Sequence, residues 1–162
     1  MDLKNKNVLI LGLGVSGVST VKALNKLGAN IFITVLKDEK ELKEFISQIE
    51  YIDLKLYLGT NDVPLDKIDL IIKSPGISLT NNIIKEAMEM DIEVITDLEL
   101  AYRISPNSKF IAITGTNGKT TTTTLTGEFF KKAGYNTHVA GNIGVGILWD
   151  VVNSQKEDIF VI

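Results

Sequence analysis

The sequence contains no cysteine, and this absence removes two classes of site. Disulfide bonds and thiolate metal sites are excluded among its 162 residues. Histidine and tryptophan occur once each, as His138 and Trp149. His138 lies in an apolar stretch of strand type, where a packed or surface histidine is more common than a metal ligand or a base. We also expect Trp149 and Tyr102 to serve in packing.

Strong charge of one sign and long apolar runs are missing too. The formal net charge is −3 and no basic cluster stands out, so nucleic-acid binding is not indicated. The longest apolar runs, such as residues 8–11, are far too short to span a membrane. Residues 1–6 lack the apolar segment of a signal peptide. A cytoplasmic location fits these absences.

The most informative segment present is residues 114–121, which read Thr-Gly-Thr-Asn-Gly-Lys-Thr-Thr. A strand-type apolar run (109–113) precedes it, and a helix is expected over residues 122–132. A strand, a glycine loop and a helix, in this order, hold the phosphates of a nucleoside triphosphate in many proteins. The segment therefore predicts a phosphate loop.

Each residue type in this loop has a chemical reason to be there. Gly115 and Gly118 let backbone N–H groups approach phosphate oxygens. Lys119 supplies a positive charge, and the hydroxyl of Thr120 is a ligand suited to magnesium. The helix start near Lys119 adds a partial positive charge. The predicted ligands are ATP and Mg²⁺.

The loop departs from the usual pattern in its spacing. Only two residues separate Gly115 from Gly118, where the usual P-loop has four between its first glycine and the Gly-Lys pair. An ordinary strand-to-helix turn with a chance Gly-Lys pair is the alternative. Five consecutive threonines (120–124) have poor helix propensity, and such local exceptions are often functional.

Another glycine loop, the first along the chain, occupies residues 12–17, which read Gly-Leu-Gly-Val-Ser-Gly between a strand (7–11) and a helix (16–27). This is the G-x-G-x-x-G pattern in the context of a dinucleotide site. NAD or FAD would also require an acid at the end of the next strand, which here ends Thr34-Val35-Leu36. The loop can still hold another pyrophosphate, or its glycines can serve packing alone.

Two smaller clusters also follow strands. Residues 73–77 read Lys-Ser-Pro-Gly-Ile, and residues 141–144 read Gly-Asn-Ile-Gly. Turns at the carboxyl ends of parallel strands lie on the edge of a sheet where ligands bind. Asn142 offers a hydrogen bond to a polar ligand there. Ordinary turns are the alternative for both clusters.

Strand and helix signals alternate along the whole chain, which predicts an α/β fold. The polar break at residues 105–108 separates a Rossmann-like parallel-sheet first domain (1–106) from the start of a P-loop-type α/β ATP-binding domain (107–162). The expected further elements are strands over 30–36, 54–58, 68–72, 92–95, 137–140 and 158–162, and helices over 40–49, 81–90, 97–102 and 146–152.

The second part is thin for a domain of its own, so we expect a piece of a longer protein. A small complete domain whose last strand lies at a sheet edge is the alternative. Asp150 and Asp158 flank helix and strand ends, where we expect them to be solvated.

Taken together, the four segments at 12–17, 74–77, 114–121 and 141–144 resemble those of the Mur ligases of peptidoglycan synthesis, over residues 3–162. The phosphate loop is shared with the wider family, which includes folylpolyglutamate synthase. Asn117 stands where the Mur ligase that adds L-alanine usually has histidine. The resemblance is to the branch that adds D-glutamate.

The resemblance implies an ATP-dependent amide ligase with three domains, whose substrates are UDP-N-acetylmuramoyl-L-alanine and D-glutamate. ATP phosphorylates the substrate carboxylate, and the amine of D-glutamate attacks the acyl phosphate. The implied ATP-binding residues are Gly115, Thr116, Asn117, Gly118, Lys119, Thr120 and Thr121, with Lys119 catalytic and Thr120 on the metal. The implied UDP-substrate residues are Gly14, Val15, Ser16, Thr34, Ser74, Pro75, Gly76 and Asn142.

One departure from the family concerns uracil. Family members usually carry an acid followed by a small hydroxyl or similar residue at the end of the second strand, where this chain has Val35 and Leu36. Two other functions remain open at this point: a nucleotide-binding module without catalysis, and an oxidoreductase that uses the first glycine loop. The sequence does not indicate an oligomeric state.

Overall fold

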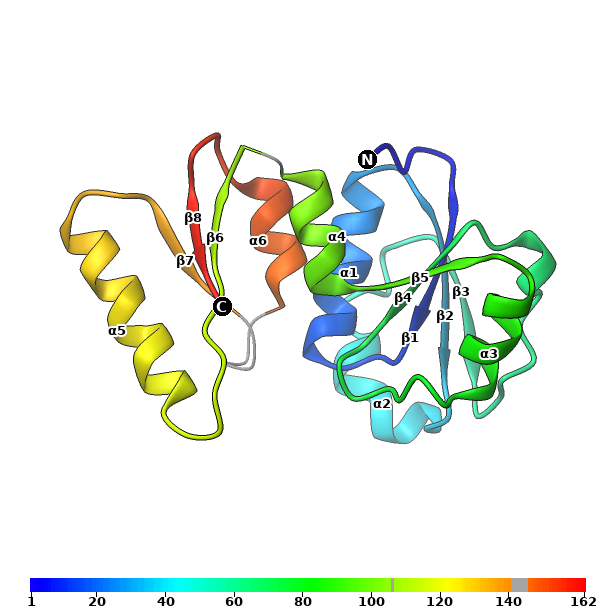
Figure 1. Ribbon diagram of the computed structural model, residues 1–162. Coiled ribbons are helices and arrows are strands. Elements are labelled where there is room, and N and C mark those ends of the chain that lie inside the picture. The colour runs from blue at the N-terminus through cyan, green and yellow to red at the C-terminus, as the bar shows by residue number, and fades with distance from the viewer. Residues whose placement is uncertain (106, 141–145) are drawn as a thin grey trace.

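The computed structural model describes residues 1–105, 107–140 and 146–162 and contains two parallel sheets (Figure 1). The strand order of the larger sheet is β3-β2-β1-β4-β5, and all its neighbouring strands are parallel. Its strands are β1 (Asn7–Leu11), β2 (Asn30–Val35), β3 (Leu54–Leu58), β4 (Leu70–Lys73) and β5 (Glu93–Thr96). This order is that of a Rossmann-like sheet, and it confirms the predicted α/β class.

Helices cover both faces of this sheet. Val8 and Ile10 of β1 pack toward α1 (Val15–Lys26), α2 (Glu39–Ile46) and α4 (Asp97–Ile104). Leu9 and Leu11 pack on the other face, toward α3 (Asn82–Glu89) and the 3₁₀ helix η1 (Leu65–Lys67). Strands that are buried on both faces need apolar residues at every position, which explains the unbroken apolar run of β1.

The smaller sheet has the order β6-β8-β7 and is also parallel. Its strands are β6 (Lys109–Ile111), β7 (Thr137–Val139) and β8 (Ile159–Val161), with helices α5 (Lys119–Lys132) and α6 (Ile147–Asn153). Figure 1 shows α5 on the outer side of this sheet and α6 between the sheet and α1. Because β8 is the central strand and is fully buried, the alternative that placed the last strand at an edge is wrong.

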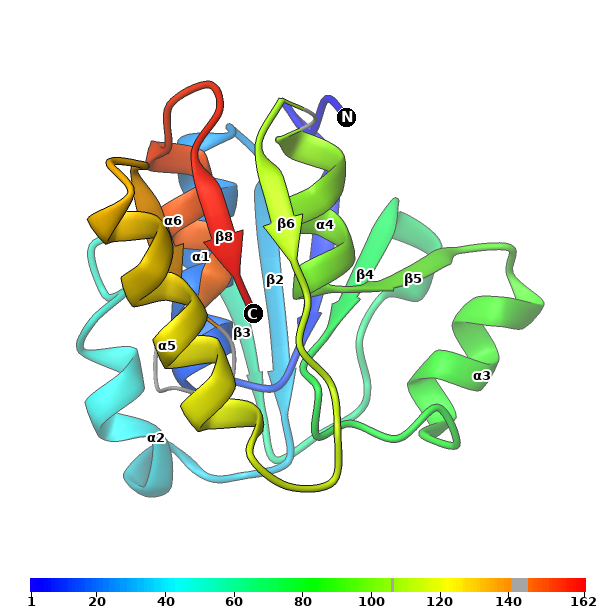
Figure 2. The same cartoon turned by 60° about the vertical axis from the view of Figure 1, so that its left-hand side comes forward.

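The hydrophobic core runs without a break from the first sheet to the second. Leu24 of α1, Leu148 of α6 and Phe160 of β8 are fully buried members of one cluster. The first turns of α1 and α5 lie on the same side of the molecule, the lower side in both views (Figures 1 and 2). The assignment of residues 1–106 and 107–162 to two domains with separate ligands stays a prediction, and Pro106 lies outside the described residues.

Several expected bounds differ from the structure. The strand expected over 68–72 is β4 (Leu70–Lys73), because Ile68 is the C-cap of the 3₁₀ helix before it. The helix expected over 40–49 ends at Ile46, although Ile49 remains buried in the turns that follow. Trp149 and Tyr102 are 41% and 61% exposed, so they are less packed than expected. Within the described ranges, no helix combines the length and the apolar character needed to cross a bilayer.

Candidate nucleotide-binding site

A pocket of about 680 Å³ opens at the carboxyl ends of β1 and β4, where the strand order changes direction. Ligands of open α/β sheets bind in this crevice. Seven of the eight residues predicted to bind the UDP substrate line it, namely Gly14, Val15, Ser16, Thr34, Ser74, Pro75 and Gly76. The eighth, Asn142, lies outside the described residues. The structure therefore brings together segments that are 60 residues apart in the chain.

The three glycines of the first loop have different roles. Gly12 has a φ of +96°, and a Cβ atom there would lie 3.0 Å from Ser74 Oγ. A Cβ atom on Gly17 would lie 2.7 Å from the carbonyl oxygen of Gly12, so this glycine lets α1 pack on the loop. Nothing lies within 4 Å of the position that a Cβ atom would take on Gly14. Gly14 therefore leaves open space where a ligand can approach the backbone.

The Ser74 loop is held against β1 by hydrogen bonds. Ser74 N donates to the carbonyl of Leu11 over 3.0 Å. The ammonium group of Lys73 donates to the carbonyls of Ile77 (3.0 Å) and Ser74 (3.5 Å), and these two bonds tie the ends of the turn together. The sequence alone did not predict this role for Lys73. Its position at the end of a strand, directly before Ser-Pro-Gly, was the feature that could have indicated it.

The electrostatics of the pocket favour an anion. Among the described residues that line it, Lys37 is the one that carries a charge. The N-terminus of α1 begins at Val15 with no acidic residue in its first turn, so its partial positive charge is not cancelled. A phosphate or pyrophosphate group is the chemistry that this end of the pocket suits.

The end of β2 offers no carboxylate to a ribose. The pocket is lined there by Thr34, Val35, Leu36 and Lys37. The hydroxyl of Thr34 already donates to the carbonyl of Thr60 over 2.6 Å, and its own carbonyl accepts from Gly12 N over 3.0 Å. Val35 is half-buried and packs against the core, whereas Leu36 is 66% exposed. The acid that a dinucleotide site requires is thus missing from the wall itself.

The second glycine loop joins β6 to α5 and is exposed throughout residues 114–122. Gly118 has a φ of +77° and is the N-cap of α5, so the 14-residue helix begins at Lys119, near which its start was expected. Its first turn contains no acidic residue. Lys131 and Lys132 lie in its last turn, where the helix dipole favours positive charge. The loop thus combines a left-handed glycine with an open helix N-terminus, as phosphate binding requires.

Lys119 and the threonines of α5 have defined contacts. The ammonium group of Lys119 folds back onto the carbonyl of Gly115 and lies 3.5 Å from that of Thr116. Thr123, which is 4% exposed, donates to the carbonyl of Lys119 over 2.9 Å, and this bond accommodates one threonine inside the helix. Thr120 and Thr121 are exposed. In the described part of the chain, no group of three or more acidic, histidine or cysteine side chains forms a metal site.

Comparison with known proteins identifies the family. Residues 6–96 match the family described as Mur ligase MurD-like, N-terminal domain. The chain belongs to this family. It is 45% identical to UDP-N-acetylmuramoylalanine–D-glutamate ligase of Alkaliphilus metalliredigens over 165 residues, which cover 100% of this chain and 36% of that protein.

Two further relatives bear the same name. The ligase of Clostridioides difficile is 43% identical over 162 residues, which cover 99% of this chain and 36% of the relative. The ligase of Caldanaerobacter subterraneus is 43% identical over 159 residues, which cover 98% of this chain and 35% of the relative. This MurD-like chain therefore spans little more than a third of the length of these relatives.

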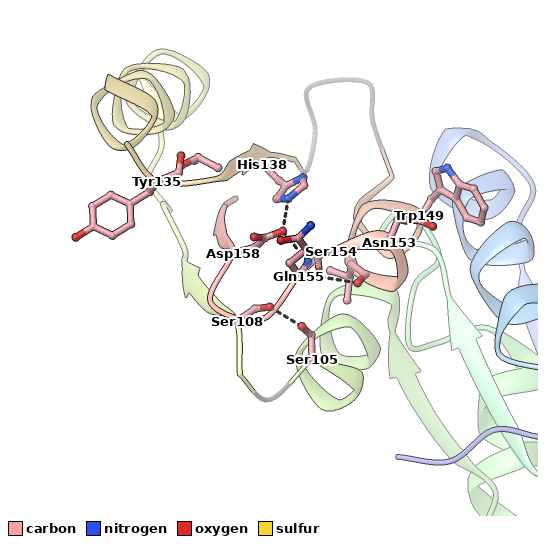
Figure 3. A network of polar contacts seen from close by, with 11 residues as sticks. Ser105, Ser108, Tyr135, His138, Trp149, Asn153, Ser154, Gln155 and Asp158 are labelled. Carbon is pink, nitrogen blue, oxygen red and sulfur yellow. Dashed lines mark hydrogen bonds and ion pairs between the residues drawn. The ribbon is translucent and has the colours of Figure 1, made fainter. Parts of the chain in front are cut away.

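A polar cluster beside β8 corrects one expectation about this MurD-like chain (Figure 3). Asp158, expected to be solvated, is 3% exposed and accepts hydrogen bonds from Gln155 N and from His138, each over 2.9 Å. Burial raises the pKa of Asp158, but these hydrogen bonds outweigh it, so that the pKa lies below its ordinary value. Asp150 is half-buried; burial raises its pKa, and His138 offsets part of the rise.

Proposed function

We propose that the chain is the N-terminal part of an ATP-dependent ligase that joins D-glutamate to UDP-N-acetylmuramoyl-L-alanine in peptidoglycan synthesis. The observation that carries this proposal is the presence of two glycine loops on two different sheets, one in an anion-favouring pocket and one on an open helix N-terminus. A ligase that uses ATP to activate a UDP-linked substrate needs two such loops. The names of the relatives supply the substrates.

The pocket of the first sheet would hold the UDP group. The backbone at Gly14 and the N-terminus of α1 would receive the pyrophosphate, and the loop Ser74–Pro75–Gly76 would form the opposite wall. Lys37 would add a positive charge at the rim. Since Val35 and Leu36 replace the usual acid and hydroxyl, uracil would be held by apolar contact and backbone groups rather than by a carboxylate. Asn142 would reach the muramoyl-alanyl part.

The loop of the second sheet would hold ATP and Mg²⁺ through residues Gly115–Thr121. Its fit to a triphosphate rests on the left-handed Gly118, the exposed backbone and the 14-residue helix behind it. Lys119 would leave its loop carbonyls to stabilise charge on the transferred phosphoryl group, and the Thr120 hydroxyl would contact the metal. Bound Mg²⁺ would neutralise phosphate charge during transfer.

The proposed reaction has two steps. The γ-phosphoryl group of ATP passes to the carboxylate of the L-alanyl end, which gives an acyl phosphate and ADP. The amine of D-glutamate then attacks the acyl carbon, and inorganic phosphate leaves as the amide bond forms. The reaction would take place in the cytoplasm.

Phosphate release tests the proposal. The chain extended to the length of its relatives should release phosphate only when ATP, magnesium, UDP-N-acetylmuramoyl-L-alanine and D-glutamate are all present. The 162-residue chain should release no phosphate. Thr120 would supply only one ligand to the metal, and the proposal places the D-glutamate site outside these residues. Binding of both nucleotides without phosphate release by the extended protein would favour a nucleotide-binding module. Activity with another amino acid in place of D-glutamate would favour another Mur ligase.

A further inference from the structure

The hydroxyl group of Ser19 joins α1 to the start of α6, the helix that lies between α1 and the second sheet (Figure 1). Its Oγ donates to the carbonyl of Gly146 over 2.6 Å and accepts from the backbone N–H of Trp149 over 2.9 Å. Ser19 is 7% exposed, so water competes little for these two bonds. One hydroxyl thus satisfies a donor and an acceptor in the first turn of α6, on a segment about 130 residues further along the chain.

The contact between α1 and α6 leaves no room for another atom. A Cβ atom on Gly146 would lie 2.2 Å from Ser19 Cβ and 3.2 Å from Ser16 Cα. Ser16 also lines the pocket of the first sheet. The wall of the pocket therefore touches the start of α6 directly, with nothing placed between them.

A second set of hydrogen bonds joins the C-terminal ends of α1 and α6. Two turns after Ser19, the ammonium group of Lys26 donates to Val152 O over 2.9 Å and to Asn153 Oδ1 over 2.5 Å. Because the N-terminal halves meet at Ser19 and the C-terminal ends meet at Lys26, α1 and α6 run parallel. Between the Ser19 bonds and the Lys26 bonds, Leu148 and Val151 are buried in the same hydrophobic cluster as residues of α1.

We propose that Ser19 is a positioning residue that couples the ligand pocket of the first sheet to the second sheet. A ligand that binds the N-terminus of α1 holds Ser16 and the turn that carries Ser19, and Ser19 in turn holds the start of α6. Stabilisation gained in the pocket is thereby passed to the second sheet, which bears the phosphate loop. The inference rests on the proposed function, since it takes the UDP substrate as the ligand of the pocket.

The chain contains its own probe of this contact. Trp149 is its only tryptophan, and its backbone N–H is one of the two groups that Ser19 holds. Tryptophan fluorescence therefore reports on α6, while far-UV circular dichroism receives the larger share of its helical signal from the four helices α1 to α4. Thermal unfolding followed by both signals separates the two parts of the molecule.

The experiment compares the chain with its Ser19→Ala variant, with and without saturating UDP-N-acetylmuramoyl-L-alanine. In the unaltered chain, the ligand should raise the unfolding midpoint by the same amount in both signals. In Ser19→Ala, the ligand should still bind in calorimetry and still raise the midpoint seen by circular dichroism. The ligand-dependent rise of the Trp149 midpoint should be smaller than the rise seen by circular dichroism, because only the Lys26 bonds and the shared core still join α1 to α6.

Thr20→Val is the matched control. Thr20 is buried on the same helix, but its hydroxyl donates to Ser16 O within α1 and not across the contact. This variant should behave like the unaltered chain. If Ser19→Ala does not fold, Gly146→Ala tests the same contact by forcing α6 away from Ser19.

The outcomes separate the inference from the function on which it rests. If the ligand binds and the Trp149 midpoint of Ser19→Ala rises as much as that of the unaltered chain, Ser19 does not couple the sheets. If the ligand also shifts the two midpoints of Thr20→Val by different amounts, any change in α1 has this effect and the assignment to Ser19 is wrong. If the unaltered chain shows no binding heat with UDP-N-acetylmuramoyl-L-alanine, the proposed function fails and the inference fails with it.

Discussion

The imidazole Nε2 of His138 lies 2.9 Å from Oδ2 of Asp158. This bond joins β7 to the buried carboxylate of the residue that directly precedes β8. The His138 ring also stacks on Phe160, with centroids 4.6 Å apart and an interplanar angle of 12°. The same carboxylate oxygen accepts from Gln155 N, which fixes the turn that leads into the strand (Figure 3). The central strand of the second sheet is thus held by a polar contact as well as by apolar packing.

We predict that Asp158→Ala lowers the free energy of unfolding by about 1–3 kcal/mol, because it removes the buried acceptor of the hydrogen bonds from His138 and from Gln155 N. Urea unfolding followed by Trp149 fluorescence measures this change. Asp53→Ala, at an exposed position, is the control and should change stability by less than about 0.5 kcal/mol. Equal effects of the two substitutions would contradict the role of Asp158.

The same pair predicts a pH dependence with a definite sign. The pKa of Asp158 is lowered in the folded protein, so its carboxylate stabilises the fold fully above the ordinary aspartate pKa of about 3.9. That contribution is lost as the pH falls from there through the lowered pKa. The difference in stability between the unaltered chain and Asp158→Ala should therefore be constant near neutral pH and shrink below about pH 4. A difference that grows on acidification would show that the sign is wrong.

The first glycine loop allows a paired prediction that separates binding from folding. Gly14→Ala should leave the unfolding midpoint unchanged, because nothing lies within 4 Å of the added methyl group, but should weaken binding of UDP-N-acetylmuramoyl-L-alanine. Gly17→Ala should destabilise the fold by about 1–3 kcal/mol, because its methyl group would meet the carbonyl oxygen of Gly12 at 2.7 Å. Calorimetry and thermal unfolding measure the two effects. Unimpaired binding by Gly14→Ala would place the ligand elsewhere.

A close approach between α5 and β7 gives a fourth prediction. A methyl group on Gly127 would lie 2.2 Å from Val139 Cγ2, so Gly127→Ala should cost about 1–3 kcal/mol of stability. Adding Val139→Ala removes the clashing methyl group, and the double variant should lose less than the sum of the two single losses. Urea unfolding of the four proteins measures the coupling. Strict additivity would mean that the two residues do not meet.

Lys119 should matter for catalysis and little for folding. Lys119 is exposed, and its side-chain hydrogen bonds within the described part of the chain go to carbonyls of its own loop, so Lys119→Ala should change the unfolding free energy by less than about 1 kcal/mol. In the chain extended to the length of its relatives, kcat should fall by about 100-fold or more, as expected when a charge that stabilises the transition state is removed. Lys131→Ala, which breaks an exposed pair with Glu128, is the control and should retain full turnover. Equal turnover by the two variants would reduce Lys119 to a surface charge.

Much of the fold could be predicted from local sequence alone. The apolar run of β1, the glycine loop after it and the first helix follow from short-range patterns, and each was expected to within one or two residues. The pocket residues around Gly14 and Ser74 could also be predicted together, because loops after parallel strands meet at one edge of a sheet. Both inferences need only residues close in sequence and a rule of topology.

Contacts between distant segments could not be predicted in this way. The burial of Asp158 depends on the register that sets β7 beside β8, and a charged residue next to a strand usually predicts exposure. The bond between Ser19 and Gly146 depends on the packing of α6 against α1, and no periodicity in either helix indicates its partner. The Ile68 boundary was missed because a 3₁₀ helix has no clear sequence signal.

The most direct test of the central claim is a calorimetric titration of this chain with UDP-N-acetylmuramoyl-L-alanine and, separately, with NAD. The pocket favours a pyrophosphate through the α1 N-terminus and Lys37, and its described lining residues include no carboxylate for a dinucleotide ribose. We predict saturable binding of the UDP substrate in the absence of ATP, and weaker or no binding of NAD. Tighter binding of NAD than of the UDP substrate would contradict the account.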